Sequence, residues 1–442
     1  MRVLRIVFLS GCAGLLLAQP QTQTPEYQGP SILTRGTGPS NAYVPETSIR
    51  PYFLVQGTFD NALTPVSVDS QGNVTKLNSY GVEAQVGLYG EHQWKRNLLE
   101  LDYRGNYRDY AASTYLNGFN HLLRLALTHT ISKRSQVRLL ELAGTYARSF
   151  LAGMNYYDGT IFQTLPTDEL FDSRVNYFLT SATYIYQKTP RLSFSASGDG
   201  FLVRRQATAL YGVTGAAARG DMAYRISRRT TVGLNYEFSK FDFTKAFGGT
   251  QVHTLGINYA TRISRLWEFG LFVGGSRVES QFLQNVTLDP VVAAILGETR
   301  GTVISHNIHW APAIEARLVR AFHRAAVSVQ YTRRINPGNG VYLTSQGENA
   351  VGAISYTGVR SWSFNMSAGY SAMKGLVQSL GGYRCTYVGA GATHHLAKDF
   401  FINARIDNRR YDVGTATDFT RNPLRVVLGI GWSPGEHPLS VW

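Results

Sequence analysis

Residues 97–110 read NLLELDYRGNYRDY, and this stretch decides the fold. Its odd positions, Leu99 to Tyr107, are apolar or aromatic apart from one glycine, whereas its even positions, Glu100 to Arg108, are charged or carry an amide. Successive side chains of a β-strand point to opposite faces, so the stretch predicts a strand with one apolar and one charged face. The same alternation recurs at 232–239, 255–262, 304–315, 361–370 and 424–432.

The length of these alternating segments favours a membrane barrel over a soluble sheet. Many keep the pattern for roughly nine to fourteen residues, whereas soluble strands usually have ~5–6 and a strand that crosses a bilayer needs ~9–11. Only 16% of the 442 residues are charged, while the chain has 26 Tyr, 22 Phe and 44 Gly. This composition argues against a disordered chain, a helical bundle and a helical membrane protein. A closed barrel can span a membrane because closure pairs every backbone polar group.

Short basic turns divide the chain into units of similar length. A hairpin unit of about 38 residues repeats, and two units hold about 20 extra residues, at 150–173 and 284–302, on the side opposite the basic turns. Eight turns join sixteen strands, and strands near 51–60 and 423–432 bring the prediction to about eighteen. The weak segment 347–357 leaves sixteen strands open. The turns are centred near residues 95, 133, 189, 228, 264, 322, 360 and 397.

The N-terminus has the features of a secretory signal at residues 1–18. Arg2 and Arg5 precede an apolar stretch of about 12 residues, which is shorter than the ~20 that a membrane helix needs, and Ala18 is a plausible cleavage residue. Lipoprotein processing at Cys12 stays open, because Leu-Ser-Gly-Cys resembles a lipoprotein cleavage box. Residues 19–49 are rich in Pro, Gln and Thr and are predicted to form a lead-in to a barrel at 50–442.

The sequence offers no set of residues for catalysis, a cofactor or a metal ion. Gly-x-Ser-x-Gly, His-Glu-x-x-His and phosphate-loop motifs are absent. His306 and His309 are three apart on a predicted strand and face opposite sides, so they cannot share a metal ion. Two Cys are too few for a disulfide scaffold, and removal of the signal would leave Cys385 alone. We therefore expect no enzymatic activity, no cofactor and no metal site.

The net charge of +14 has two interpretations that stay open. The basic turns would be attracted to anionic lipid headgroups, or they are ordinary solvated turns. Nucleic-acid binding is not expected, because the basic residues occur singly or in pairs rather than in one patch.

The charged faces of the strands are expected to line the lumen. Opposite charges would pair across neighbouring strands as struts, or some arginines would line a constriction that favours anionic or sugar-like solutes, and both interpretations stay open. Arg104, Arg108 and Arg124 form the best cluster, and Arg405 with Arg409 forms a second. The lumen candidates are Arg104, Arg108, Arg124, Arg219, Arg225, Arg317, Arg405, Arg409, Glu100 and Asp102.

The two long insertions, 150–173 and 284–302, are expected to fold into the lumen and to set its bore. The first insertion is acidic, so it would meet the inward arginines. Its candidate residues are Asp158, Asp168, Glu169 and Asp172.

On these patterns, residues 50–442 resemble the transmembrane β-barrels of the Gram-negative outer membrane. The resemblance rests on the strand alternation, the turn asymmetry, and the aromatic ends at Trp432 and Trp442. It implies an all-β, closed antiparallel barrel with short periplasmic turns, longer external loops and both termini in the periplasm. It also implies outer-membrane lipid and the barrel assembly machinery as partners.

Such a barrel would be a channel for passive passage of small polar or anionic solutes, saccharides included. The length and the N-terminal layout are also similar to uncharacterised barrels found near exopolysaccharide-secretion systems. An export or assembly barrel with polysaccharide-secretion components as partners therefore stays open as an alternative. A closed structural barrel is a third possibility.

Overall fold

The computed structural model describes most of the chain from residue 47 onward. The described residues are 47–112, 114–147, 170–287, 294, 297–376, 381–396, 399–413, 420–434 and 437–438. The predicted signal (1–18) and nearly all of the lead-in (19–49) lie outside them, so those two assignments stay predictions. No helix in the described part is long and apolar enough to cross a bilayer.

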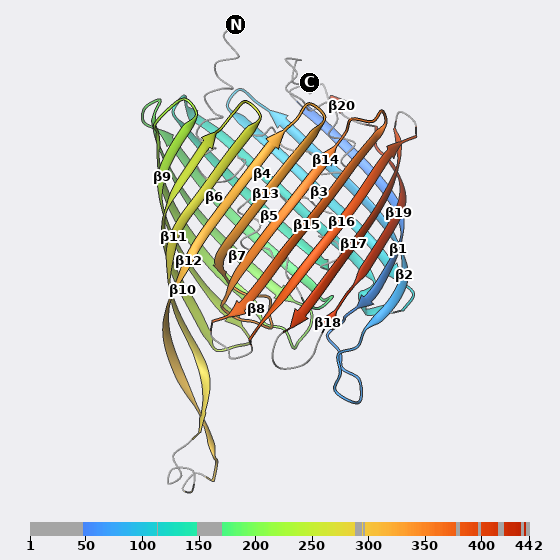
Figure 1. Ribbon diagram of the computed structural model, residues 1–442, viewed down its shortest axis with the longest axis vertical. Helices are drawn as coiled ribbons and strands as arrows, with labels where there is room; N and C mark the ends of the chain where they lie inside the picture. The colour runs from blue at the N-terminus through green and yellow to red at the C-terminus, as the bar shows by residue number, and fades with distance from the viewer. Residues whose placement is uncertain are drawn as a thin grey trace.

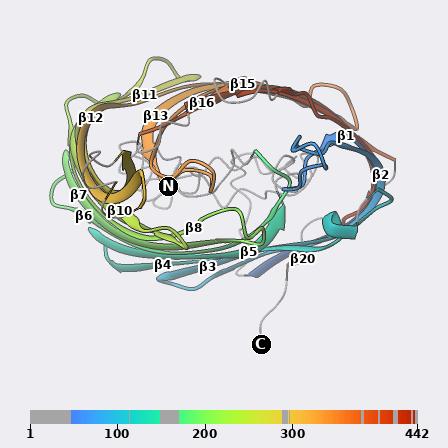
Figure 2. The same cartoon turned by 90° about the horizontal axis from the view of Figure 1, so that it is seen from below.

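Eighteen long strands, β1 to β17 and β19, form one closed antiparallel barrel (Figures 1 and 2). Each strand pairs with the next one in the chain, and β19 closes the sheet by pairing Arg425 to Trp432 with Asp60 to Phe53 of β1. The prediction of about eighteen strands is confirmed. The strands are β1 Thr47–Leu63, β2 Leu77–Gln93, β3 Asn97–Tyr110, β4 Gly118–Ser132, β5 Ser135–Ala147, β6 Arg174–Gln187, β7 Leu192–Arg205, β8 Gly212–Arg225, β9 Thr230–Thr244, β10 Gly248–Arg262, β11 Trp267–Thr287, β12 Arg300–Ala321, β13 Ala325–Asn336, β14 Ser345–Tyr356, β15 Trp362–Gly375, β16 Gly382–His395, β17 Phe400–Val413 and β19 Leu424–Trp432, with two-residue strands β18 Thr420–Arg421 and β20 His437–Pro438 and a 3-10 turn at Thr114–Leu116.

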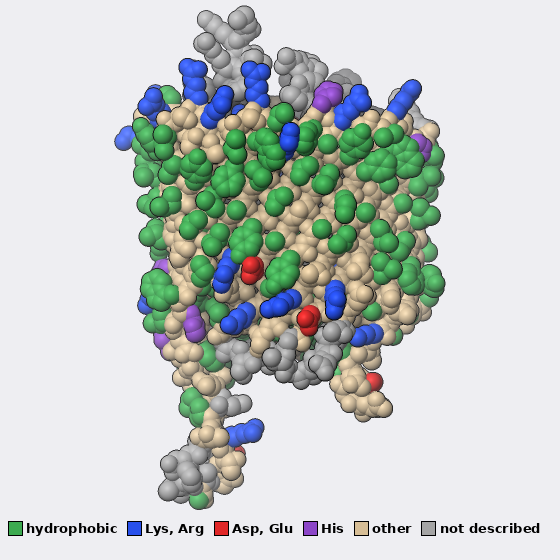
Figure 3. Space-filling model, in the orientation of Figure 1, with side chains coloured by type: hydrophobic (Ala, Val, Ile, Leu, Met, Phe, Trp, Pro, Cys, Tyr) green, Lys and Arg blue, Asp and Glu red, His purple; other side chains and the backbone are tan. Residues whose placement is uncertain are grey.

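The two ends of the barrel differ. The connections that follow the even-numbered strands are short and basic, and the first and last strands begin and end beside them (Figures 1 and 3). We call this end the turn end and the opposite end the loop end. An even number of antiparallel strands brings the start of β1 and the end of β19 to one side of the barrel, as observed here.

The outer surface of the barrel is a broad apolar belt (Figure 3). Residues paired on neighbouring antiparallel strands lie on the same face of the sheet. The apolar positions of the alternating segments therefore lie side by side and form this belt. Leu428 is 62% exposed on the outer face, whereas its neighbour Val427 is buried on the inner face. The arrangement is that of a membrane-spanning barrel.

The described residues of the insertion at 284–302 do not fold into the lumen, so this expectation was wrong for them. β11 and β12 instead stay paired as far as Thr287 and Arg300, and this ribbon projects away from the rim at the loop end (Figure 1). β10 pairs with β11 only as far as Phe282, and β13 pairs with β12 only as far as Ile314. The two strands satisfy each other's backbone groups, so the insertion extends the hairpin.

Candidate functional site

The inward side chains of β17, β19, β1, β2 and β3 include many charged residues among polar and aromatic ones, and we call this surface the charged wall. On β3 the even positions are buried inside the barrel, while Tyr107 between them is exposed on the outside. The strand pairing carries the same orientation to the neighbouring strands. The charged wall consists of Asp60, Glu83, Glu100, Asp102, Arg104, Arg108, Arg405, Asp407, Arg409 and Arg425.

A hydrogen-bonded network centred on Glu83 joins four strands of the charged wall, β1, β2, β3 and β19. The carboxylate of Glu83 accepts a hydrogen bond from Arg425 at 2.6 Å and from Gln56 at 2.7 Å. Asn106 donates to it at 3.2 Å, and Arg425 also lies 3.9 Å from Asp60. Glu83 is therefore a buried carboxylate whose charge is matched within the barrel wall, although the sequence interpretation did not single it out.

Other charges on this wall pair within one strand. Arg104 holds Asp102 with two hydrogen bonds of 2.7 and 3.0 Å, and Arg405 holds Asp407 with two of 2.6 and 2.7 Å. Residues two apart on a strand share a face, so each arginine reaches the carboxylate beside it. The charge pairs therefore form both along strands and across them, and Glu100 lies 3.9 Å from Arg138 across β4.

Other predicted arginines make different contacts. Arg108 donates from Nε to the Leu116 carbonyl at 3.2 Å and lies over the Tyr110 ring. Arg409 lies over the Tyr387 ring, 5.8 Å from its centroid. Among the described residues no ion pair joins Arg409 or Arg124 to a carboxylate.

The remaining candidates do not join this group. Arg219 and Arg225 are inward on β8, where Arg219 pairs with Asp221 at 3.2 Å. Arg317 is inward on β12, opposite Gln330. The structure therefore brings together Arg104, Arg108, Arg124, Arg405 and Arg409 near the closure of the barrel and leaves the other three elsewhere. Glu100 and Asp102 lie on β3 in the same group of residues.

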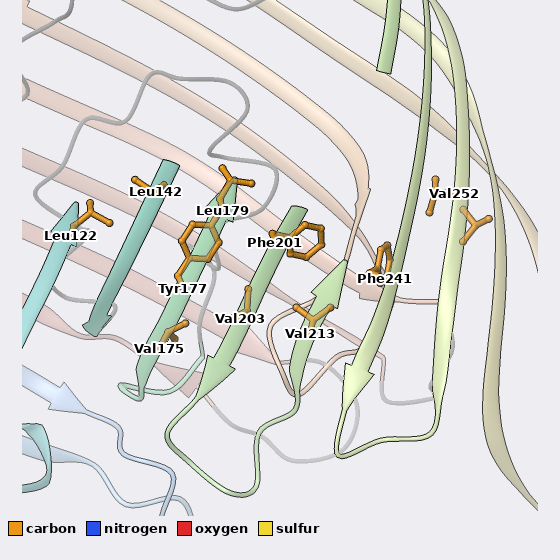
Figure 4. Packing of buried hydrophobic residues seen from close by; sticks show 11 residues of the cluster. Leu122, Leu142, Val175, Tyr177, Leu179, Phe201, Val203, Val213, Phe241 and Val252 are labelled. Carbon is orange, nitrogen blue, oxygen red and sulfur yellow. The ribbon is translucent and has the colours of Figure 1, made fainter. Parts of the chain in front are cut away.

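The loop-end half of strands β4 to β11 presents a different inner surface, which we call the apolar wall (Figure 4). Ile335 and Leu376, from the β13 and β15 side of the barrel, pack against it together with Phe243. The sequence interpretation missed this wall. A signal was present in β6, where both faces carry apolar residues. The apolar wall consists of Leu122, Leu142, Val175, Tyr177, Leu179, Phe201, Val203, Val213, Phe241, Val252 and Val278.

The described end of the first insertion, residues 170–173, reaches across the lumen. Asp172 forms a buried ion pair with Arg421, and it exchanges hydrogen bonds of 2.7 and 2.8 Å with the backbone of Thr64. Leu170 packs in a cluster with Tyr383 of β16 and other residues of β15 to β17, although β6 follows this segment directly. These contacts are those of an inward-folded segment. Asp158, Asp168 and Glu169 lie outside the described residues.

A second segment, residues 337–344 between β13 and β14, also crosses the lumen. Its Gly340 carbonyl accepts from the Tyr211 amide at 3.0 Å, and its Thr344 carbonyl accepts from the Leu376 amide at 2.9 Å. Tyr342 packs against Tyr383 of β16, and burial raises the pKa of its phenol, which stays neutral. Gly338 has φ of +72°, and a Cβ there would lie 1.9 Å from a carbonyl oxygen, so only glycine fits.

Arg334, at the base of this segment, ties opposite parts of the barrel together. Its guanidinium donates to Glu237 of β9 at 3.0 Å and pairs with Glu315 of β12. It also lies over the Phe272 ring at 4.9 Å. The sequence interpretation did not single out Arg334 as a lumen residue.

Metal binding finds no support in the part of the chain that the structure describes. No group of three or more His, Cys, Asp or Glu side chains there could hold an ion. Cys385 is a buried thiol that donates to the Thr386 carbonyl at 3.8 Å.

Comparisons with known proteins concern the fold. No family model matches this chain, and no curated protein is similar to it in sequence. The crystal structure of Pseudomonas aeruginosa OccK2 (OpdF) with glucuronate is 10% identical, covers 87% of this chain and 98% of its own, and has a TM-score of 0.43. The structure of P. aeruginosa OpdK with vanillate is 10% identical, covers 87% of this chain and 98% of its own, and has a TM-score of 0.41. A bacterial polysaccharide outer-membrane secretin is 11% identical, covers 86% of this chain and 97% of its own, and has a TM-score of 0.33.

Proposed function

We propose that this chain is an outer-membrane channel for passive passage of small polar or anionic solutes, saccharides included. The observation that carries the proposal is the charged wall inside a closed barrel. Arginine presents a planar fork of donors that matches a carboxylate or a phosphate, and Arg124 and Arg409 have no carboxylate paired to them among the described residues. A solute anion would complete their contacts.

The two segments that cross the lumen would set the bore of this channel. Both pack against residues of β15 to β17 inside the barrel, so a solute must pass beside them. Deletion of residues 155–170 is then expected to raise single-channel conductance. An unchanged conductance would count against a constriction by this insertion.

We further propose that the turn end faces the periplasm and that the barrel assembly machinery inserts the chain. Short periplasmic turns and longer external loops are usual for outer-membrane barrels. Protease added to whole cells would then cut the β11–β12 ribbon and leave the turn end intact. Cleavage at the basic turns instead would reverse the orientation.

The first experiment is the single-channel conductance of the refolded mature protein in a planar bilayer, with the reversal potential in a salt gradient. Steady, anion-selective steps would support the channel. The contrary outcome is a sealed bilayer with a barrel that is folded by its heat-shifted gel mobility. That outcome would favour a closed structural barrel, a second candidate that the packed cross-lumen segments support.

A further inference from the structure

Three cations stand on the outer face of β15, β16 and β17, close to the loop end. Lys374, Arg384 and Arg410 are all exposed. Their neighbours Met373, Cys385 and Tyr411 are buried together inside the barrel. Adjacent residues of a strand face opposite sides, so the three cations point outward. Figure 3 shows blue side chains below the apolar belt on this side of the barrel.

The strand register arranges these cations in a row. Arg384 pairs with Ala372, two residues from Lys374, and Arg410 pairs with Thr386, two residues from Arg384. The same two-residue step repeats from strand to strand toward the turn end. Because the strands are tilted relative to the barrel axis (Figure 1), this shift offsets the tilt, and the row lies roughly across the barrel. Three cations on neighbouring strands therefore share one level of the wall.

Two acidic side chains share the outer face with the row: Asp412 lies opposite Arg384, and Glu348 of β14 lies opposite Ala372. In the described part of the barrel, neither forms an ion pair with Lys374, Arg384 or Arg410. The other side of the barrel ends differently, in aromatic pairs such as Tyr107 with Phe119 at 4.8 Å.

A cation on a lipid-facing wall is much less unfavourable near the membrane interface than at the bilayer midplane. A row of cations at the edge of the apolar belt is therefore suited to the level of the lipid headgroups. Arginine binds phosphate oxygens with two parallel hydrogen bonds, and lysine adds a point charge. We propose that Lys374, Arg384 and Arg410 bind phosphate-bearing lipid headgroups in the leaflet at the loop end. The proposal does not depend on transport through the lumen.

The test needs a reporter beside the row, because basic residues also surround the turn end. Thr386 is exposed on the outer face and lies opposite Arg410, so a Thr386→Trp variant places an indole there. The protein is reconstituted in phosphatidylcholine vesicles with brominated phosphatidic acid or brominated phosphatidylcholine. The quenching of the added tryptophan is obtained by subtracting the parent protein. It gives the relative association of each lipid at the row.

The proposal predicts several-fold stronger association of phosphatidic acid than of phosphatidylcholine. Lys374→Gln, Arg384→Gln and Arg410→Gln together should remove most of this preference. The matched control, Arg134→Gln, Arg228→Gln and Arg265→Gln at the turn end, should keep it. Heat-shifted gel mobility and conductance verify that each variant folds and conducts as the parent does.

Two outcomes would overturn the proposal. Equal quenching of the added tryptophan by both brominated lipids, in the Thr386→Trp protein with the row intact, would mean that the row has no preference for phosphate headgroups. Loss of the preference with inorganic phosphate, at constant ionic strength, would mean that the site takes free phosphate rather than lipid.

Discussion

The charged wall and the apolar wall lie on different sides of the same lumen and are stabilised in different ways. Glu83 and Arg425 in the charged wall are matched by hydrogen bonds within the sheet, so this wall needs no cover. Leu142 and Val175 in the apolar wall are fully buried, and residues from across the barrel pack on them. The outer face must be apolar in a membrane, whereas the inner face is free to be either. The loop-end half of this lumen is thus packed partly like a soluble core.

The largest expected effect comes from breaking the charged wall. Glu83→Ala leaves Arg425 buried without its closest carboxylate. Removal of one partner of a buried ion pair typically costs about 3–5 kcal/mol in the free energy of unfolding. Urea unfolding of the barrel in lipid vesicles measures this loss.

Glu268→Ala is the matched control for that variant. Its partner Arg262 and Glu268 itself have 43% and 44% exposed side chains, and exposed pairs contribute only ~0–1 kcal/mol. Equal losses in the two variants would mean that the buried network adds nothing beyond an ordinary pair.

The apolar wall should be sensitive to the loss of packing. Leu142→Ala removes a side chain with no exposed surface, and we expect a loss of about 2–3 kcal/mol in the free energy of unfolding. Leu139→Ala on the outer face of the same strand, where the leucine is 44% exposed, should cost less. A larger loss at Leu139 would show that lipid contact outweighs the lumen packing. The same urea titration compares the two variants.

The fold could be predicted because its signals are local. Alternation within one strand gives the two faces, and the spacing of the basic turns gives the number of strands. Whether a candidate such as Arg104 or Arg405 faces inward or outward follows from its odd or even position along the strand. The apolar face of a strand such as 97–110 then lies outside, as a membrane requires.

The contacts across the lumen could not be predicted in the same way. Arg334 reaches Glu237 and Arg421 reaches Asp172, and these partners are 97 and 249 residues apart. The alternation along a strand predicts that a side chain faces the lumen, but it does not predict which strand lies opposite that side chain. The segment 337–344 did carry a signal, since Val-Tyr-Leu after Pro-Gly-Asn-Gly is an apolar run in a loop. The expectation for the insertion at 284–302 failed because its extra residues were interpreted as a loop, although the strand alternation continues into them.

Release of the first cross-lumen segment should sharpen the contrast between the two walls. Asp172→Asn removes the charge that holds Arg421, and a charge-assisted hydrogen bond contributes about 1.5–3 kcal/mol. Residues 170–173 would then detach from Thr64 and β17. We expect a higher and noisier single-channel conductance, together with a loss of about 1.5–3 kcal/mol in the free energy of unfolding. A conductance equal to that of the parent would mean that this anchor does not hold the constriction.

The smallest effect is expected at the β11–β12 ribbon, which belongs to neither wall. Replacement of residues 284–303 by a short Asn-Gly turn removes strand pairs that no other strand contacts, since β10 leaves β11 at Phe282. Surface changes away from buried features usually alter stability by less than about 0.5 kcal/mol. Conductance and the urea midpoint should therefore match those of the parent. A raised conductance would mean that the ribbon covers the mouth of the channel after all, and the inward-folding expectation would regain support for this insertion.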